Sequence, residues 1–173
     1  MSLRPPVTVS RYSFVLAFLA ATGAAHAQGL PPGVRLGMTA DALQSALPVE
    51  RVVRPQRLAG GLVGSWRTAP IAMAGLPFEP TFFFAGGELK RVAYLTVTDD
   101  PAQVPQLAAA FAELVQWGRA QFGHELGSSD PGSAYAAWSQ GDADIYAQHT
   151  VDGRRATVRL VYKASQRKDG SAL

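Results

Sequence analysis

The sequence predicts an α+β fold in which an antiparallel β-sheet, with about six strands in two meanders, packs on one long and one short helix. Apolar residues recur at helical spacing between residues 104 and 122, and this periodicity predicts the long helix. Two stretches, 81–98 and 134–162, contain strand-like runs joined by two-residue turns with glycine. Such turns are typical of antiparallel hairpins.

Residues 1–27 have the three-part layout of a secretory signal peptide. Two basic residues, Arg4 and Arg11, accompany an uncharged, mostly apolar run at 12–25. This run is shorter than the roughly 20 apolar residues that a membrane-spanning helix needs. We therefore expect a removable signal rather than a membrane anchor.

The signal ends in Ala25-His26-Ala27, the small–x–small pattern that signal peptidase cleaves, so we expect Gln28 to be the mature N-terminus. The remaining chain divides by composition into an extended leader at 28–33, a single α+β domain at 34–163 and a flexible tail at 164–173. The expected location is therefore periplasmic or secreted.

Charge and cysteine content exclude several classes of function. Two of the sixteen basic residues lie in the signal, which leaves fourteen against thirteen acidic residues, too balanced a charge to favour nucleic acid as a partner. The chain has no cysteine, which excludes disulfides, thiolate metal sites and cysteine nucleophiles. No second apolar run approaches membrane-spanning length, so we expect no transmembrane segment after signal removal. No motif indicates a cofactor or an oligomeric state.

A short helix is predicted after the leader. Thr39 is suited to cap its N-terminus, and Asp41 lies in the positively polarised first turn. Met38 and Leu43 have the spacing of a hydrophobic staple. Pro48 ends the helix, because a proline disfavours helical geometry at the residue before it.

The first meander is predicted from a glycine-interrupted strand at 58–66 and a hairpin of strands 81–84 and 89–98 around Gly86-Gly87. This turn places Phe84 opposite Leu89 and Phe82 opposite Arg91. Both faces of the hairpin then carry aromatic bulk. Either both faces are covered, or a bulge shifts the register, and the sequence leaves this choice open.

The long helix begins near Asp99-Asp100-Pro101, with Pro105 delaying the regular helix by one turn, and ends at Gly123. We expect its apolar stripe to pack on the sheet. The stripe consists of Val104, Leu107, Phe111, Leu114, Val115, Gly118 and Phe122.

After a loop at 124–133, a three-stranded meander is predicted with turns at Gly141-Asp142 and Asp152-Gly153. In this register Trp138 faces Ile145, which faces Leu160, and one side of the meander is apolar. The other side is polar, as in a sheet that is covered on one face only.

The polar side of this meander is the candidate interaction surface. It carries Tyr146, Arg155 and Arg159, and cation–π packing between the tyrosine and the arginines competes there with binding of a ligand.

No residue pattern predicts a catalytic or metal site. His124 and His149 lack the spaced partners that a metal site requires. A hydrolase would have to combine Ser128 or Ser129 with His149 and Asp152, without the Gly-x-Ser-x-Gly motif. The Asp-x-Asp pair at 142–144 is better explained by a turn and a strand than by paired carboxylates.

The segment VRLGMTADALQSALP, residues 34–48, resembles the Gly-Met-Thr/Ser helix start of small bacterial envelope proteins. These are the outer-membrane lipoproteins of the SmpA/OmlA type and domains like the β-lactamase-inhibitor protein. The resemblance implies a helical layer on an antiparallel sheet and a role in protein–protein contacts. The chain lacks the lipidated cysteine, and Leu47-Pro48 replaces the usual Leu-Gly-x-Pro ending.

We therefore expect an exported, non-enzymatic domain that binds a protein, such as an envelope protein, or another envelope component. One alternative is a carrier of a small apolar ligand or lipid, with a cavity between helix and sheet lined by Phe82-Phe83-Phe84 and Trp66. The other alternative is a hydrolase with an unrecognised site.

Overall fold

The computed structural model describes residues 29–165, so the predicted signal peptide and its cleavage site lie outside the described residues, as does the tail after Ser165. In chain order the elements are α1 (Ala40–Ala46), β1 (Glu50–Arg51), the 3-10 turn η1 (Ala59–Gly61), β2 (Val63–Arg67), β3 (Ile71–Met73), β4 (Leu76–Ala85), β5 (Glu88–Thr98), the 3-10 turn η2 (Pro101–Gln103), α2 (Val104–Phe122), β6 (Leu126–Asp130), β7 (Ser133–Gln140), β8 (Ala143–Asp152) and β9 (Arg155–Ala164).

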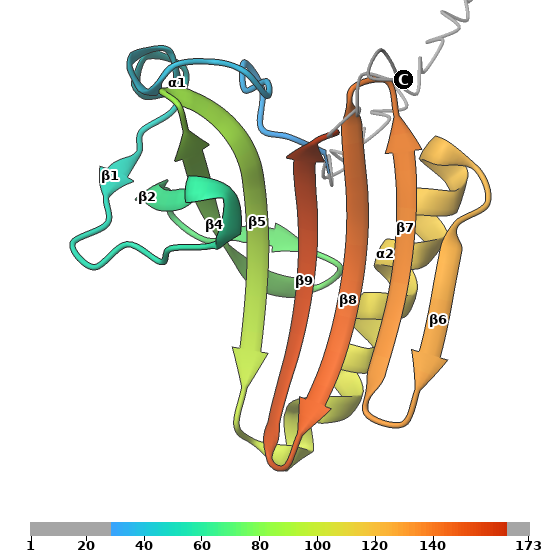
Figure 1. Cartoon of the computed structure of the whole chain (residues 1–173). Coiled ribbons are helices and arrows are strands. Elements are labelled where there is room, and N and C mark those ends of the chain that lie inside the picture. The colour runs from blue at the N-terminus through green and yellow to red at the C-terminus, as the bar shows by residue number, and fades with distance from the viewer. Residues whose placement is uncertain (1–28, 166–173) are drawn as a thin grey trace, which may run out of the picture.

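The strands form one antiparallel sheet in the order β1-β2-β4-β5-β9-β8-β7-β6, with β3 paired to β4 (Figure 1). The predicted α+β class with an antiparallel sheet is confirmed. The described sheet has nine strands rather than about six, because β1, β3 and β6 were not predicted. Two of these three are short, and β6 has no buried residue, so none carries a strong apolar alternation.

One face of the sheet, here called the inner face, holds the apolar core. Helix α2 lies on β7, β8 and β9 and buries Leu107, Ala110, Leu114 and Gly118 there. At the other end of the sheet, Met38 and Leu43 from the α1 region join the same buried cluster as Phe82. Within the expected leader, residues 29–33 bend rather than extend, and the Tyr94 hydroxyl donates a hydrogen bond to the Gly29 carbonyl at 3.1 Å.

The ends of both helices follow the sequence signals. The Thr39 side chain accepts a hydrogen bond from the Ala42 amide at 3.3 Å, and the helix stops before Pro48. Asp100 caps the 3-10 turn that precedes α2, and the regular helix starts at Val104, one turn after Pro101. The predicted delay before the regular helix is therefore confirmed.

The β4–β5 hairpin contains a bulge, which was one of the two alternatives that the phenylalanine run left open. Gly86-Gly87 is the two-residue loop, and Phe84 pairs with Leu89 as predicted. Beyond that pair, Lys90 is an extra residue, so Phe83 pairs with Arg91 and Phe82 pairs with Val92. The predicted pairing of Phe82 with Arg91 is therefore wrong by one residue.

The C-terminal strands differ from the sequence prediction in two places. Residues 124–133 contain β6 and the first part of a four-stranded meander, rather than only a loop. The last turn consists of Gly153 and Arg154, because Asp152 pairs with Arg155. Gly153 has φ +59° and is the first loop residue, which suits a type II′ turn rather than the predicted type I′ turn.

This correction moves β9 by two residues relative to β8, so that Ile145 pairs with Tyr162 and Ala147 with Leu160. A shift of two residues preserves the faces, because side chains alternate with period two. The inner and outer sides of the meander are consequently those predicted.

Gly118 allows α2 to approach β7 closely. A Cβ atom built at Gly118 would lie 2.3 Å from Cζ2 of Trp138, which is far inside van der Waals contact. Trp138 is 5 % exposed, and its indole N–H donates to the Gly123 carbonyl at 3.0 Å. The ring is thus fixed by packing and by a hydrogen bond, and it has little room to move.

We predict that Gly118→Ala destabilises the protein by about 1–3 kcal/mol, the usual cost of overpacking. The sign is informative, because the same change in an unobstructed helix stabilises by roughly 1 kcal/mol. Urea unfolding measures the difference, and Gly118→Ala combined with Trp138→Leu is the control, in which most of the added cost should disappear. A stabilising Gly118→Ala would show that α2 does not approach β7 this closely.

Candidate interaction surface

The face of the sheet opposite α2, here called the outer face, is polar and aromatic where it is formed by β5, β9, β8 and β7. Its residues lie in cross-strand rows. One row is Tyr135, Gln148, Arg159 and Leu95, and the next is Ala137, Tyr146, Val161 and Ala93. In Figure 1 this face is turned toward the viewer, with α2 behind the strands and no described helix across β7 and β8. It is the broad sheet surface that the described helices leave open.

Four side chains from more than one cross-strand row contact one another in succession across the outer face. They are Phe83, Arg91, Tyr146 and Tyr135, here called the aromatic–arginine row. The Arg91 guanidinium lies 5.5 Å from the ring centroid of Phe83 and 5.8 Å from that of Tyr146. The rings of Tyr146 and Tyr135 follow at 5.6 Å. Such cation–π and ring contacts fix the side chains in place before any partner binds.

Close packing at one end supports this row. Phe83 is only 2 % exposed although it lies outside the inner core, because its ring covers Gly64. A Cβ atom at Gly64 would lie 2.9 Å from that ring. Val161, also on the outer face, is completely buried. The row is therefore built into the sheet and is not a set of freely rotating surface side chains.

The outer face also carries two arginines that form no ion pair in the described part of the chain, although Asp144 and Glu79 lie on the same face. Neither Arg91 nor Arg159 has an ion pair or a side-chain hydrogen bond among residues 29–165. The Arg91 Nε atom is shielded from solvent and has no hydrogen-bond partner there. Unpaired buried donors are costly, so the Arg91 side chain has a hydrogen-bonding capacity that the described residues do not satisfy.

Two of the three residues predicted for this surface lie at its centre and the third at its margin. Tyr146 and Arg159 are half-buried, with Tyr146 opposite Val161 and Arg159 opposite Gln148. Arg155 is exposed beside the turn at Gly153, opposite Asp152. In the structure Tyr146 contacts Arg91 and Tyr135. Neither of these two residues was part of the surface predicted from the sequence.

The Lys90 bulge explains why Arg91 was missed. In an unbulged hairpin Arg91 lies opposite Phe82, whereas the extra residue moves it to the outer face opposite Phe83. The signal in the sequence was the excess of aromatic bulk on both faces, which predicted a bulge as one solution but did not locate it.

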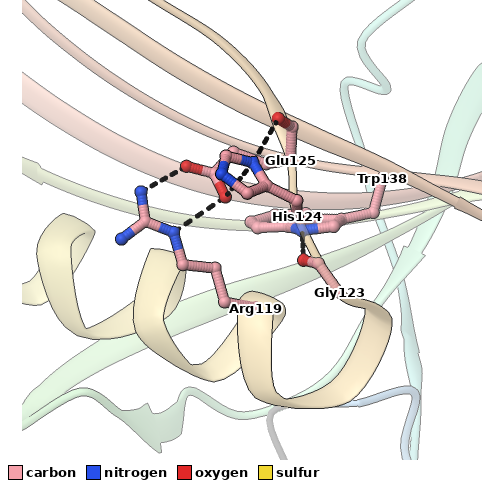
Figure 2. Close-up of polar contacts among 5 residues, drawn as sticks. All are labelled: Arg119, Gly123, His124, Glu125 and Trp138. Atoms are coloured by element: carbon pink, nitrogen blue, oxygen red, sulfur yellow. Dashed lines mark hydrogen bonds and ion pairs between the residues drawn. The ribbon is translucent and has the colours of Figure 1, made fainter.

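The junction between α2 and β6 holds His124, one of the two histidines that the sequence pattern did not support as metal ligands (Figure 2). The Arg119 guanidinium donates two hydrogen bonds to the Glu125 carboxylate, one of them at 2.8 Å. His124 Nδ1 lies 3.8 Å from the same carboxylate, while its side chain is 92 % exposed. Trp138 donates to the Gly123 carbonyl beside them. These contacts link the C-terminal end of α2 to β6 and β7. His124 itself has the environment of a surface residue.

The hydrolase residues are not assembled in the described part of the chain. Ser128 and Ser129 lie on adjacent positions of β6, so that their side chains point to opposite faces. The ring of His149 stacks on Phe111 with centroids 6.0 Å apart, and its Nε2 atom has no hydrogen-bond partner. No hydrogen bond joins His149 to either serine or to Asp152 among residues 29–165.

The apolar run proposed for a carrier cavity is divided between the two faces. Phe82 is completely buried in the inner core, whereas Phe83 lies under Arg91 on the outer side. These two rings therefore cannot line one common cavity.

In residues 29–165, no three histidine, aspartate or glutamate side chains gather in a way that would hold a metal ion. None of the helices in that range has the length and apolar character that crossing a membrane requires. Asp144, one of the Asp-x-Asp pair, accepts hydrogen bonds from Ser139 and Ser165 and lies 3.6 Å from Lys163. Comparison of the chain with protein-family models, curated proteins and solved structures finds no match.

The Arg119–Glu125 pair gives a pH-dependent prediction. The hydrogen bonds from Arg119, followed by a backbone hydrogen bond, lower the pKa of Glu125 to about 2 from an ordinary value of 4.5. A lowered carboxyl pKa stabilises the folded state above pH 4.5, and the stabilisation is lost as the pH falls through about 2.

We predict that wild type melts above Glu125→Gln at pH 7 and that this difference shrinks steadily between pH 4.5 and 2. Thermal melts of both proteins across this range measure it. A difference that stays constant down to pH 2 would show that the ionised carboxylate does not stabilise the fold.

Proposed function

We propose that this is an exported, non-enzymatic protein that binds an acidic polypeptide segment of a cell-envelope partner through its outer face. The observation that carries the proposal is the aromatic–arginine row, in which Arg91 is held between two rings and forms no ion pair among the described residues. Arg159 adds a second unpaired cation on the same face. The partner of this chemistry is a chain that presents carboxylates next to apolar or aromatic groups.

Several physical features favour a protein partner for this face. Tyrosine and arginine are enriched at protein interfaces, because each combines a large apolar area with polar groups. Tyr135 and Tyr146 are already positioned by their ring contact, so binding would cost little side-chain entropy. A guanidinium can donate in-plane hydrogen bonds to both oxygens of a carboxylate while its faces remain stacked on rings.

The location is part of the same proposal. The layout of residues 1–27 favours export with cleavage before Gln28. The resemblance of residues 34–48 to small envelope proteins favours a role in contacts between proteins.

The test is site-specific photo-crosslinking. A photo-reactive amino acid replaces Gln148 on the outer face, and in a matched control it replaces Gln116 on the exposed side of α2. Each protein is illuminated in an envelope extract of the host cell. We expect a discrete protein adduct from position 148 only, and we expect excess polyglutamate, but not polylysine, to suppress it.

Reversing the charge of one arginine on the outer face gives a quantitative test of the same proposal. Arg159→Glu should weaken adduct formation by about tenfold or more, because it places a like charge opposite the partner's carboxylates. Gln116→Glu should leave adduct formation unchanged. Equal adducts from positions 148 and 116, or an adduct insensitive to Arg159→Glu and polyglutamate, would contradict the proposal.

A further inference from the structure

A pocket of about 300 Å³ lies where the η1 turn meets the ends of β4, β5 and β9. Its apolar lining includes Ala59 and Leu62 from the η1 segment and Ala85 from β4. Its cationic lining consists of Lys90, Arg91 and Lys163. A volume of this size is at the lower end of the range for small-molecule sites, about 300–1,000 Å³.

The pocket has one more positive charge than the neighbouring acids neutralise. Lys90 pairs with Glu88, and Lys163 lies 3.6 Å from Asp144. The pKa values of both carboxyls are lowered, that of Glu88 mainly by a hydrogen bond from Lys90 and that of Asp144 mainly by one from Ser165. Both acids are therefore ionised and already paired, which leaves the Arg91 charge without a partner among residues 29–165.

The position of the Arg91 guanidinium determines which of its groups can bind a negatively charged ligand. Its guanidinium contacts the Phe83 and Tyr146 rings, and no hydrogen bond to its nitrogens is present in the described part of the chain. Ring contacts do not use the in-plane N–H donors, which match the two oxygens of a carboxylate. The bulge that creates this arrangement also places Lys90 beside Arg91 at the pocket.

We propose that this pocket is a binding site for a small organic carboxylate. The carboxylate binds the Arg91 guanidinium between the two lysines, and the apolar body of the ligand contacts Leu62, Ala59 and Ala85. This ligand site shares Arg91 with the proposed function, but it requires neither a polypeptide partner nor the centre of the outer face.

The test uses hexanoate as the probe, with hexanol and inorganic phosphate as the two comparison ligands. Binding to the purified protein is followed by NMR chemical-shift titration of backbone amides around the pocket. We expect hexanoate to bind with a Kd of about 1–10 mM, a range suited to so small a ligand. Hexanol and phosphate should each bind at least about tenfold more weakly, because each lacks one half of the recognition.

Two variants of an exposed lining residue supply the matched control. Ala59→Glu places a carboxylate of the protein's own at the pocket and should weaken hexanoate binding by about tenfold or more, through competition and repulsion. Ala59→Gln has the same size without the charge and should remain within about threefold of wild type. Both changes are at a solvent-exposed residue, so folding should be preserved, and the spectra report this directly.

The proposal is overturned if hexanol or phosphate binds as tightly as hexanoate, or if Ala59→Glu and Ala59→Gln behave alike. Arg159→Glu, which tests the outer face, should leave hexanoate binding unchanged. An adduct from position 148 that Arg159→Glu does not weaken, found together with specific hexanoate binding, would therefore refute the proposed function alone. An adduct that Arg159→Glu weakens, found together with no specific hexanoate binding, would refute the pocket alone.

Discussion

Three consecutive phenylalanines in β4 impose the constraint on which much of this structure depends. Alternate residues of a strand point to opposite faces, so one ring of the three must leave the inner core. The hairpin resolves this with one extra residue in β5, Lys90, which keeps Phe82 opposite Val92 in the core and pairs Phe83 with Arg91 outside it. The Phe83 ring, which would otherwise be exposed on the outer face, is thereby covered by the Arg91 guanidinium.

This local solution organises the outer face. Phe83 fits only because β2 presents Gly64 beneath its ring, and Arg91 extends the contact to Tyr146 and Tyr135. A similar complementarity occurs on the inner face, where Gly118 of α2 makes room for Trp138. In both places a large ring on one element lies over a glycine on another, so packing fixes the aromatic side chains on both faces of the sheet.

Sequence reasoning predicted the parts of the fold that depend on local signals. The Thr39 cap, the delayed start of α2 and the Gly86-Gly87 turn each rest on the chemistry of a few adjacent residues, and all three are present. The faces of the C-terminal meander were also predicted correctly, since the error at Gly153 was an even number of residues. Strand β6 was missed because its sequence, Leu-Gly-Ser-Ser-Asp, has no apolar alternation.

The candidate surface was predicted only in part, for a related reason. Tyr146, Arg155 and Arg159 lie on strands whose register follows from nearby turns, and the outer face does contain them. Arg91 comes from a different hairpin, and its side of the sheet depends on where a single bulge falls. The position of a bulge depends on packing between strands that are distant in sequence, such as β2 and β4, and the sequence pattern alone does not fix it.

The most direct test of this account is a disulfide scan of the β4–β5 register, which the absence of native cysteine makes unambiguous. With the bulge at Lys90, Thr81 pairs with Ala93, whereas an unbulged hairpin would pair Thr81 with Val92. Facing residues of a strand pair have Cα separations within the roughly 4.4–6.8 Å that a disulfide spans. Under mild oxidation, Thr81→Cys with Ala93→Cys should form a disulfide readily, and Thr81→Cys with Val92→Cys should not. The opposite result would place Arg91 on the inner side and remove the basis of the outer face as a binding surface.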